Sequence, residues 1–236
     1  VAQLLREVHR IDHRVCPAPL EADVLELRLI HRHQPRFNRH GTRASAAAYV
    51  RLNRSERFPR LSVVGTPKDD GGLYLGPLGS RRHAKLVAEA IESVVPLRRC
   101  TGRPPARPRS SPCLPAQLGV ALCPCSGDVS AVAYGALVEQ VVRRLTVDHQ
   151  ALLGPLEQQM EALAAAERFE EAADVRDRAA ALADAVRRQH RLDALRSWGE
   201  ARVVLPGRGG ARLDHGRVVE AWTEDAADAP PRLPLD

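Results

Sequence analysis

The sequence predicts an α+β protein with small sheets, covering helices, a cysteine-rich segment and a helical hairpin. Its 236 residues are 44% hydrophobic but only 3% aromatic, so its cores must rest on Leu, Val and Ala. Such a composition favours small cores and paired helices over one large sandwich. Short runs with the alternation of strands lie between residues 49 and 75, and residues 130–196 follow a helical period almost continuously.

The first elements are expected to be two helices. An apolar stripe at steps of three and four residues predicts an amphipathic helix over residues 1–13. Its members are Leu4, Leu5, Val8 and Ile11. A second helix is expected over residues 21–33, where Leu25 and Leu29 are one turn apart, and Pro35 ends it.

A small sheet with one covering helix is expected next. Residues 49–52, 61–64 and 73–75 have the pattern of short strands separated by charged or Gly-rich turns. Ser80 is expected to cap a helix with an apolar stripe. The stripe consists of Ala84, Val87, Ala88, Ile91, Val94 and Val95.

The second half is expected to be mostly helical. Residues 98–115 are rich in Pro and Arg and cannot build a core from their own apolar groups. The helical stretch that follows is expected to break at Gly154-Pro155 and again near 167–170, which leaves an antiparallel hairpin. One face of its second helix is expected to carry Phe169, Ala172, Ala173, Arg176, Ala180 and Ala183. Strands at 203–205 and 217–222 predict a terminal hairpin.

The charge pattern points to nucleic acid in the first half of the chain. There are 35 Lys and Arg against 29 Asp and Glu, a formal charge of +6, and most of the cations are Arg. Arg suits bidentate phosphate contacts, although a GC-rich genome also explains an Arg excess. The expected DNA contacts are Arg32, Arg36, Asn38, Arg98, Arg99, Arg103 and Arg107. No apolar run approaches the ~18 residues of a membrane span, so a cytoplasmic protein without a membrane partner is expected.

The stretch Glu21-Ala22-Asp23-Val24-Leu25-Glu26-Leu27-Arg28-Leu29-Ile30, followed by Pro35-Arg36-Phe37-Asn38, carries a family resemblance. It resembles the end of the GIY-YIG nuclease domain of the UvrC excision nucleases. The resemblance implies that Glu26 is a catalytic carboxylate that binds Mg²⁺ or Mn²⁺, ions often held by few carboxylates plus water and phosphate oxygens. The family's Gly-Ile-Tyr and Tyr-Ile-Gly strands do not occur here. A fragment, a misplaced start, gene breakage or a lost nuclease role would each explain this.

Two further stretches resemble the same family. Tyr49-Val50-Arg51-Leu52 and Tyr74-Leu75-Gly76-Pro77 look like the region that follows its nuclease domain, although the family's Lys before the first strand is absent. Cys100, Cys113, Cys123 and Cys125 resemble its four-cysteine segment. That likeness implies a [4Fe–4S] cluster or Zn²⁺, and free intracellular thiols are the alternative. The spacing departs from the family, because Ala121 stands where its third cysteine is expected.

The last resemblance lies in the hairpin. Phe169-Glu170-Glu171-Ala172-Ala173-Asp174-Val175-Arg176-Asp177-Arg178 resembles the UVR motif, through which UvrC meets UvrB. The likeness implies that a UvrB-type helicase binds through Phe169, Ala172, Ala173 and Arg176. An ordinary helical hairpin is the alternative.

The resemblance suggests a division of the chain and two classes of function. The expected segments are the end of a GIY-YIG domain (1–42), a small α/β UvrC-like segment (43–95), a Pro/Arg/Cys-rich segment (96–127), a helical region (128–196) with the UVR hairpin at about 152–187, and a hairpin or tail (197–236). The first function is a truncated excision endonuclease, with an ending like that of actinobacterial exonuclease/GIY-YIG fusions. The second is a non-catalytic repair adaptor. A regulator that shares only the UVR hairpin is a third reading.

Overall fold

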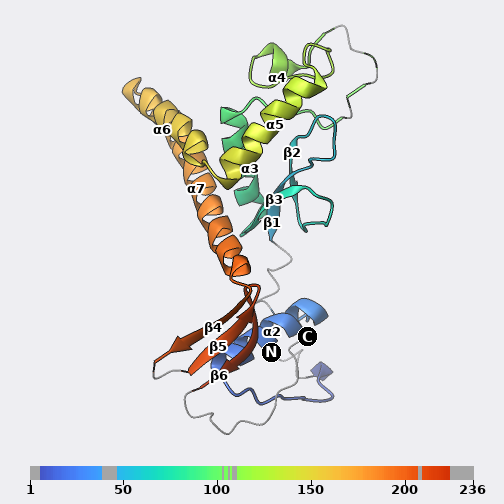
Figure 1. Ribbon diagram of the computed structural model, residues 1–236, viewed down its shortest axis with the longest axis vertical. Coiled ribbons are helices and arrows are strands. Elements are labelled where there is room, and N and C mark those ends of the chain that lie inside the picture. The colour runs from blue at the N-terminus through green and yellow to red at the C-terminus, as the bar shows by residue number, and fades with distance from the viewer. Residues whose placement is uncertain are drawn as a thin grey trace. The chain divides into compact units, whose positions relative to one another are not determined.

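The computed structural model describes residues 6–38, 47–102, 104–105, 107, 111–206 and 209–223 (Figure 1). The chain divides into two compact units, one of residues Ala46–Gln189 and one of Val1–Ser45 with His190–Asp236. Each contains helix and a three-stranded antiparallel sheet, which confirms the predicted α+β class. No helix in these described ranges is long and apolar enough to cross a membrane.

The larger unit begins with an antiparallel sheet in the order β2-β1-β3. Its strands are β1 (Ala48–Leu52), β2 (Leu61–Val64) and β3 (Leu73–Leu78), close to the predicted ones. Helix α3 (Arg81–Val94) packs against all three strands (Figure 1). Ser80 caps α3 as predicted, since its hydroxyl accepts the N–H of residue 83 at 3.1 Å.

Three longer helices complete the larger unit beyond the short α4 (Leu114–Gln117). They are α5 (Ala131–Thr146), α6 (Gln150–Ala165) and α7 (Phe169–Ser197), the last of which continues past the end of this unit. The side chains of α3, α5, α6 and α7 join the inner face of the sheet in one apolar core. This core holds the cysteine-rich segment and the hairpin on the same unit.

The predicted helix break at Gly154-Pro155 is wrong. Pro155 lies inside α6, and the chain breaks earlier, at residues 147–149. A proline within a helix costs about 3 kcal/mol. Leu152 and Leu156 flank it with no exposed surface, and burying two leucines contributes about 3–6 kcal/mol. Packing therefore outweighs the local preference.

The face of α7 that packs inside the protein differs from the face that carries Phe169 and Arg176. The buried side chains are Ala172, Val175, Ala181, Leu182, Ala185 and Val186. Of the expected face, only Ala172 is among them, while Phe169 and Arg176 are exposed. The larger aliphatic residues turn the helix toward the core because they bury more apolar area than the alanines.

The smaller unit pairs a helix with a second sheet. Helix α2 (Pro19–His33) contacts the edge strand β6 (Arg217–Trp222), and Arg28 donates to the carbonyl of Val218 at 3.0 Å. The other strands are β4 (Glu200–Leu205) and β5 (Gly209–Asp214), so the expected hairpin is a three-stranded sheet.

The helix expected over residues 1–13 is absent from most of its described part. Helical structure there is limited to Arg6 and Glu7, and residues 8–16 have no regular structure, while residues 1–5 lie outside the described ranges. Ile11 and Val15 are more than four-fifths exposed. An isolated helix of this length is marginal in water, and these apolar side chains have no surface to pack on.

Candidate functional site

Arg98, one of the residues expected to contact DNA, lies in the interior of the larger unit with 3% of its surface exposed. Its guanidinium donates to the Glu56 carboxylate at 2.8 Å, to the carbonyl of Phe58 and to two carbonyls of the cysteine-rich segment. Its backbone N–H donates to the hydroxyl of the buried Tyr134 at 2.9 Å. Arg98 therefore ties the start of the cysteine-rich segment to the β1–β2 loop, and these donors are occupied within the protein.

The neighbouring basic residues are placed differently. Arg99 is exposed and donates to the carbonyl of Glu92 at 2.8 Å. Burial raises the pKa of the Glu92 carboxyl, and the charge of Arg99 offsets part of that shift. Arg107 is exposed, and Arg103 lies outside the described residues. Among the described arginines of residues 98–107, Arg99 and Arg107 are thus accessible to a ligand.

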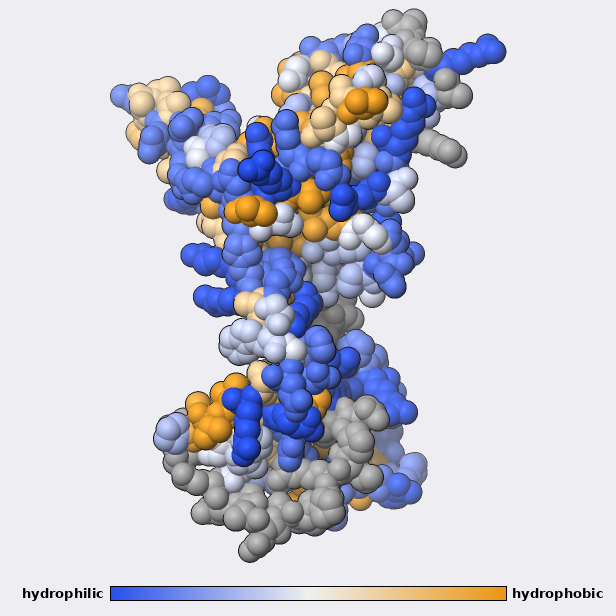
Figure 2. Space-filling model, in the orientation of Figure 1, coloured by the Kyte–Doolittle hydropathy of each residue, from blue (hydrophilic) through white to orange (hydrophobic). Residues whose placement is uncertain are grey.

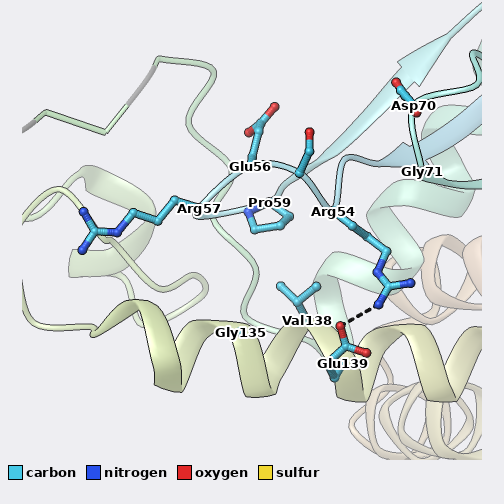
Figure 3. A pocket seen from close by; sticks show the side chains of 10 residues that line it. Arg54, Glu56, Arg57, Pro59, Asp70, Gly71, Gly135, Val138 and Glu139 are labelled. Atoms are coloured by element: carbon cyan, nitrogen blue, oxygen red, sulfur yellow. Dashed lines mark hydrogen bonds and ion pairs between the residues drawn. The ribbon is translucent and has the colours of Figure 1, made fainter.

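An open cavity of about 390 Å³ lies between the β1–β2 loop and α5 (Figure 3). Arg54 pairs with Glu139 across it at 2.9 Å, whereas Arg57 points away and stacks over Phe58 at 5.2 Å. The lining residues are Arg54, Ser55, Glu56, Arg57, Pro59, Asp70, Gly71, Gly135, Val138 and Glu139. Because acids and bases alternate around it, this cavity has no single sign of charge and does not by itself form an anion site.

The fold brings together two of the four clustered cysteines. The sulfur of Cys123 accepts the backbone N–H of Cys113 at 3.4 Å. Burial opposes ionisation of Cys123, but backbone N–H groups and the Cys113 thiol lower its pKa to about 7. Burial raises the pKa of Cys113, and the nearby Cys123 and Cys100 raise it further.

Thiolate is the form that binds metal, so the Cys113–Cys123 pair suits a soft metal or a cluster. Cys100 acts on this pair electrostatically, and Cys125 is buried two residues further along. All five cysteines are free thiols. Within the described ranges, no group of three or more His, Cys, Asp or Glu side chains stands close enough to hold a metal ion.

The α6–α7 hairpin presents an unusual apolar residue at its turn. Phe169, the first residue of α7, is 66% exposed, while Ala172 is buried and Ala173 half-buried. Arg176 is exposed and donates to Asp177 at 2.8 Å. A cavity of about 240 Å³ lies between the helices beside the turn. Figure 2 shows hydrophilic and apolar residues side by side on this hairpin.

The candidate residues of the smaller unit lie on and after α2. Glu26 and Arg32 are exposed on the helix surface. Arg36 is also exposed, lies 3.6 Å from the carboxylate of Glu7 and contacts the ring of Phe37. Asn38 is half-buried. The structure thus shows Glu26 as an exposed carboxylate, with basic side chains nearby along the chain.

One group of residues escaped the sequence analysis. Arg51, Tyr74 and Asp70 meet on the face of the sheet opposite α3: the Arg51 guanidinium pairs with Asp70, and the Tyr74 hydroxyl donates to the same carboxylate at 3.0 Å. Tyr49 lies on the same face of β1. The sequence contained a signal for this second face of the sheet, because residues 49 and 51 alternate with the buried residues 48, 50 and 52.

Two family models match the chain. Residues 47–144 match the UvrC/Cho excinuclease middle domain, and residues 150–185 match the UvrB/UvrC motif. The chain belongs to the UvrC family. The boundary between the matches, residues 145–149, coincides with the break between α5 and α6. In this UvrC-family chain the middle domain therefore contains the sheet of the larger unit, Arg98 and the four clustered cysteines. The UvrB/UvrC motif corresponds to the α6–α7 hairpin.

Individual relatives agree with this assignment. The chain is 36% identical over 170 residues to the UvrABC system protein C of Moorella thermoacetica, covering 72% of this chain and 28% of the relative. It is 34% identical over 211 residues to that of Syntrophotalea carbinolica, covering 89% and 34%. A Mycobacterium tuberculosis protein, provisionally named a bifunctional exonuclease/endonuclease, is 36% identical over 217 residues, with coverage of 89% and 33%. The chain thus spans about a third of these relatives. No solved structure matches it.

Proposed function

We propose that this protein acts in nucleotide excision repair, as the part of a UvrC-type protein that joins DNA to a UVR-binding partner. The observation that carries the proposal is the order of two modules on one unit, a UvrC middle domain followed directly by a UVR motif. The names of the relatives, which belong to the UvrABC system, support the same role. The setting would be the cytoplasm.

The proposed partner is a UvrB-type helicase, which docks on the hairpin at Phe169. Glu167, Arg168, Glu170 and Glu171 surround this ring in the sequence, so it has few apolar neighbours of its own. With 66% of its surface exposed, it would gain about 2–3 kcal/mol from burial against a partner. The small side chain of the half-buried Ala173 leaves room for close approach of a second hairpin, whereas Ala172, also expected at this contact, is buried within the chain.

The proposed contacts with DNA are electrostatic. Arg32, Arg36, Arg99 and Arg107 are exposed and suit phosphate oxygens. Asn38 would add a polar contact, Arg103 belongs to the same basic stretch, and Arg98 would act indirectly by holding that stretch in place. Phosphate contacts position a protein on DNA but carry no sequence information, so this binding would be largely independent of sequence.

The finer proposal is incision of the DNA phosphodiester. Glu26 would be the catalytic carboxylate and would bind Mg²⁺ or Mn²⁺, ions that polarise a phosphodiester. As an oxygen ligand it fits the ion, but no group of three ligands forms around it in the described ranges. We therefore derive no step through a metal at this residue. The alternative is a non-catalytic adaptor that binds DNA and the UVR partner.

The cysteine-rich segment would bind a [4Fe–4S] cluster or Zn²⁺ through Cys100, Cys113, Cys123 and Cys125. Support comes from the Cys113–Cys123 pair and from the lowered pKa of Cys123. Bound metal would cross-link a segment that is rich in Pro and Arg and poor in core residues. The contribution of the metal would be structural. It would add a second link to a segment that Arg98 already connects to the sheet.

The test is assembly on damaged DNA. The chain is mixed with a UvrB-type helicase loaded on a lesion-containing duplex, and the mass of the complex and the integrity of the strands are measured with Mg²⁺ present. The proposal expects a ternary complex. Incision lost in Glu26→Gln would support the nuclease form, and a complex without incision would support the adaptor. Absence of any complex at micromolar concentration would overturn the proposed role.

A further inference from the structure

The sheet of the larger unit has one face on which no described helix of the same unit packs as α3 does on the other. Helix α3 packs on the side of Ala48, Val50 and Leu52, which are buried. Side chains on the opposite side are only half-buried, although they lie in the middle of the sheet. They are Tyr49 and Arg51 from β1, Ser62 and Val64 from β2, and Tyr74 from β3. We call these five residues the open face.

The register makes the open face one continuous surface. Tyr49 is paired with Val64, and Arg51 is paired with Ser62 on one side and Tyr74 on the other. Directly opposed residues of antiparallel strands project to the same side of the sheet. Two of the three tyrosines of the chain therefore lie on this face, whereas the third, Tyr134, is fully buried.

The central part of the open face is held rigidly. The Asp70 carboxylate accepts hydrogen bonds from Arg51, from the Tyr74 hydroxyl and from the backbone N–H of Gly72. The Arg51 guanidinium lies 5.9 Å from the centre of the Tyr74 ring. Side chains fixed in this way lose little entropy when a ligand binds, which favours affinity.

The charged side chains in and around the open face are three bases, Arg51, Lys68 and Arg81, and two acids, Asp69 and Asp70. Residues 47–95 contain eight Lys and Arg but five Asp and Glu. Arg81 lies at the β2 edge, where it reaches the carbonyl of Val63, and Lys68 is exposed in the β2–β3 loop. Asp70 is compensated by Arg51, so its charge adds little repulsion toward an anion.

We propose that the open face binds single-stranded DNA, with the rings of Tyr49 and Tyr74 stacking on bases. Aromatic rings on an open sheet, with a basic rim, are the usual means of binding unpaired nucleotides. A duplex keeps its bases stacked inside, where side chains on the face of a sheet do not reach them. This inference extends the proposed role to an opened DNA strand, but it does not depend on the hairpin or on Phe169.

The test measures the anisotropy of a labelled 15-nucleotide oligo-dT and of a matched duplex with the full-length chain. Exchanging both tyrosines for Ala should weaken binding to oligo-dT at least about tenfold while leaving duplex binding unchanged. Tyr49→Phe with Tyr74→Phe should retain binding, since the rings remain. Val132→Ala on α5, 85% exposed and remote in the sequence, is the control for loss of an exposed side chain.

A second variant guards against misfolding of the double Ala protein. Ser62→Glu keeps both rings and adds a negative charge beside Arg51, so it should also weaken oligo-dT binding. Folding is checked by thermal melting, and Phe169→Ala should bind oligo-dT normally. Unchanged binding in a folded double Ala or Ser62→Glu protein would overturn the proposal. An equal loss of oligo-dT binding in the Phe variants would also overturn it. So would a double Ala protein that loses partner binding but still binds oligo-dT.

Discussion

Arg98 and Arg99 are neighbours with opposite environments. Arg98 is almost completely buried and bonded to Glu56 and to three carbonyl groups, whereas Arg99 is exposed and contacts Glu92. Removing one partner of a buried ion pair destabilises a protein by several kcal/mol, because the remaining group stays buried and unpaired. An exposed ion pair contributes only about 0–1 kcal/mol to stability. The role of each arginine therefore follows from burial and not from charge.

This difference predicts unequal effects of removing the two side chains. Arg98→Ala should lower the free energy of unfolding by about 2–4 kcal/mol, since it leaves buried carbonyls unpaired. Arg99→Ala should lower it by less than about 1 kcal/mol, yet weaken DNA binding. Urea unfolding of both variants provides the measurement, with each serving as the control for the other. Equal effects on stability would show that the Arg98 network has no structural role.

At the level of elements, the cysteine-rich segment depends on its four cysteines. We expect the anaerobically purified chain to bind one cluster or one Zn²⁺, because Cys123 is already prone to ionise near neutral pH. Cys123→Ser should abolish stoichiometric binding, whereas Cys16→Ser, outside the segment, should not. Iron and zinc analysis with thiol titration measures this. Five titratable thiols in folded protein, those of the segment and Cys16, with substoichiometric iron and zinc would contradict it.

Elements with strong local patterns could be predicted from the sequence, and those decided by packing could not. The strands around Tyr49 and Leu61 and the helix after Ser80 follow from alternation, a cap and an apolar stripe. The continuity of α6 through Pro155 depends on two buried leucines contributed to a shared core. The Arg98 network connects residues far apart in the sequence, and only the fold could reveal it. The cysteine cluster was expected from the sequence, and the fold adds which two of its members meet.

The α7 face shows why the motif alone was insufficient. Phe169 was correctly expected to be exposed, but the motif residues do not show which face of α7 is buried, because only Ala172 among them is buried. The spacing of Val175, Leu182 and Val186 indicates the true face. A motif that serves a partner need not coincide with the stripe that packs on the protein's own core.

At the scale of the whole molecule, DNA affinity should depend on charge. The exposed arginines at 32, 36, 99 and 107 predict that affinity for duplex DNA falls steeply with salt and varies little with sequence. Exchanging Arg99 and Arg107 for Gln should reduce the slope of log affinity against log salt by roughly 0.9 for each phosphate that is no longer neutralised. Fluorescence anisotropy over a salt series measures it. A slope near zero in the wild-type chain would reject the electrostatic account.

The central claim, docking through the UVR hairpin, is tested most directly by calorimetric titration of the chain with the matching hairpin of a UvrB-type helicase. Phe169→Ala should weaken this binding at least tenfold, the loss of about 1.4 kcal/mol or more of apolar burial. Its melting temperature should match that of the wild type, because the ring is exposed in the free chain. Val132→Ala should bind normally. No detectable partner binding, together with unfolding of the hairpin in Phe169→Ala, would contradict the account.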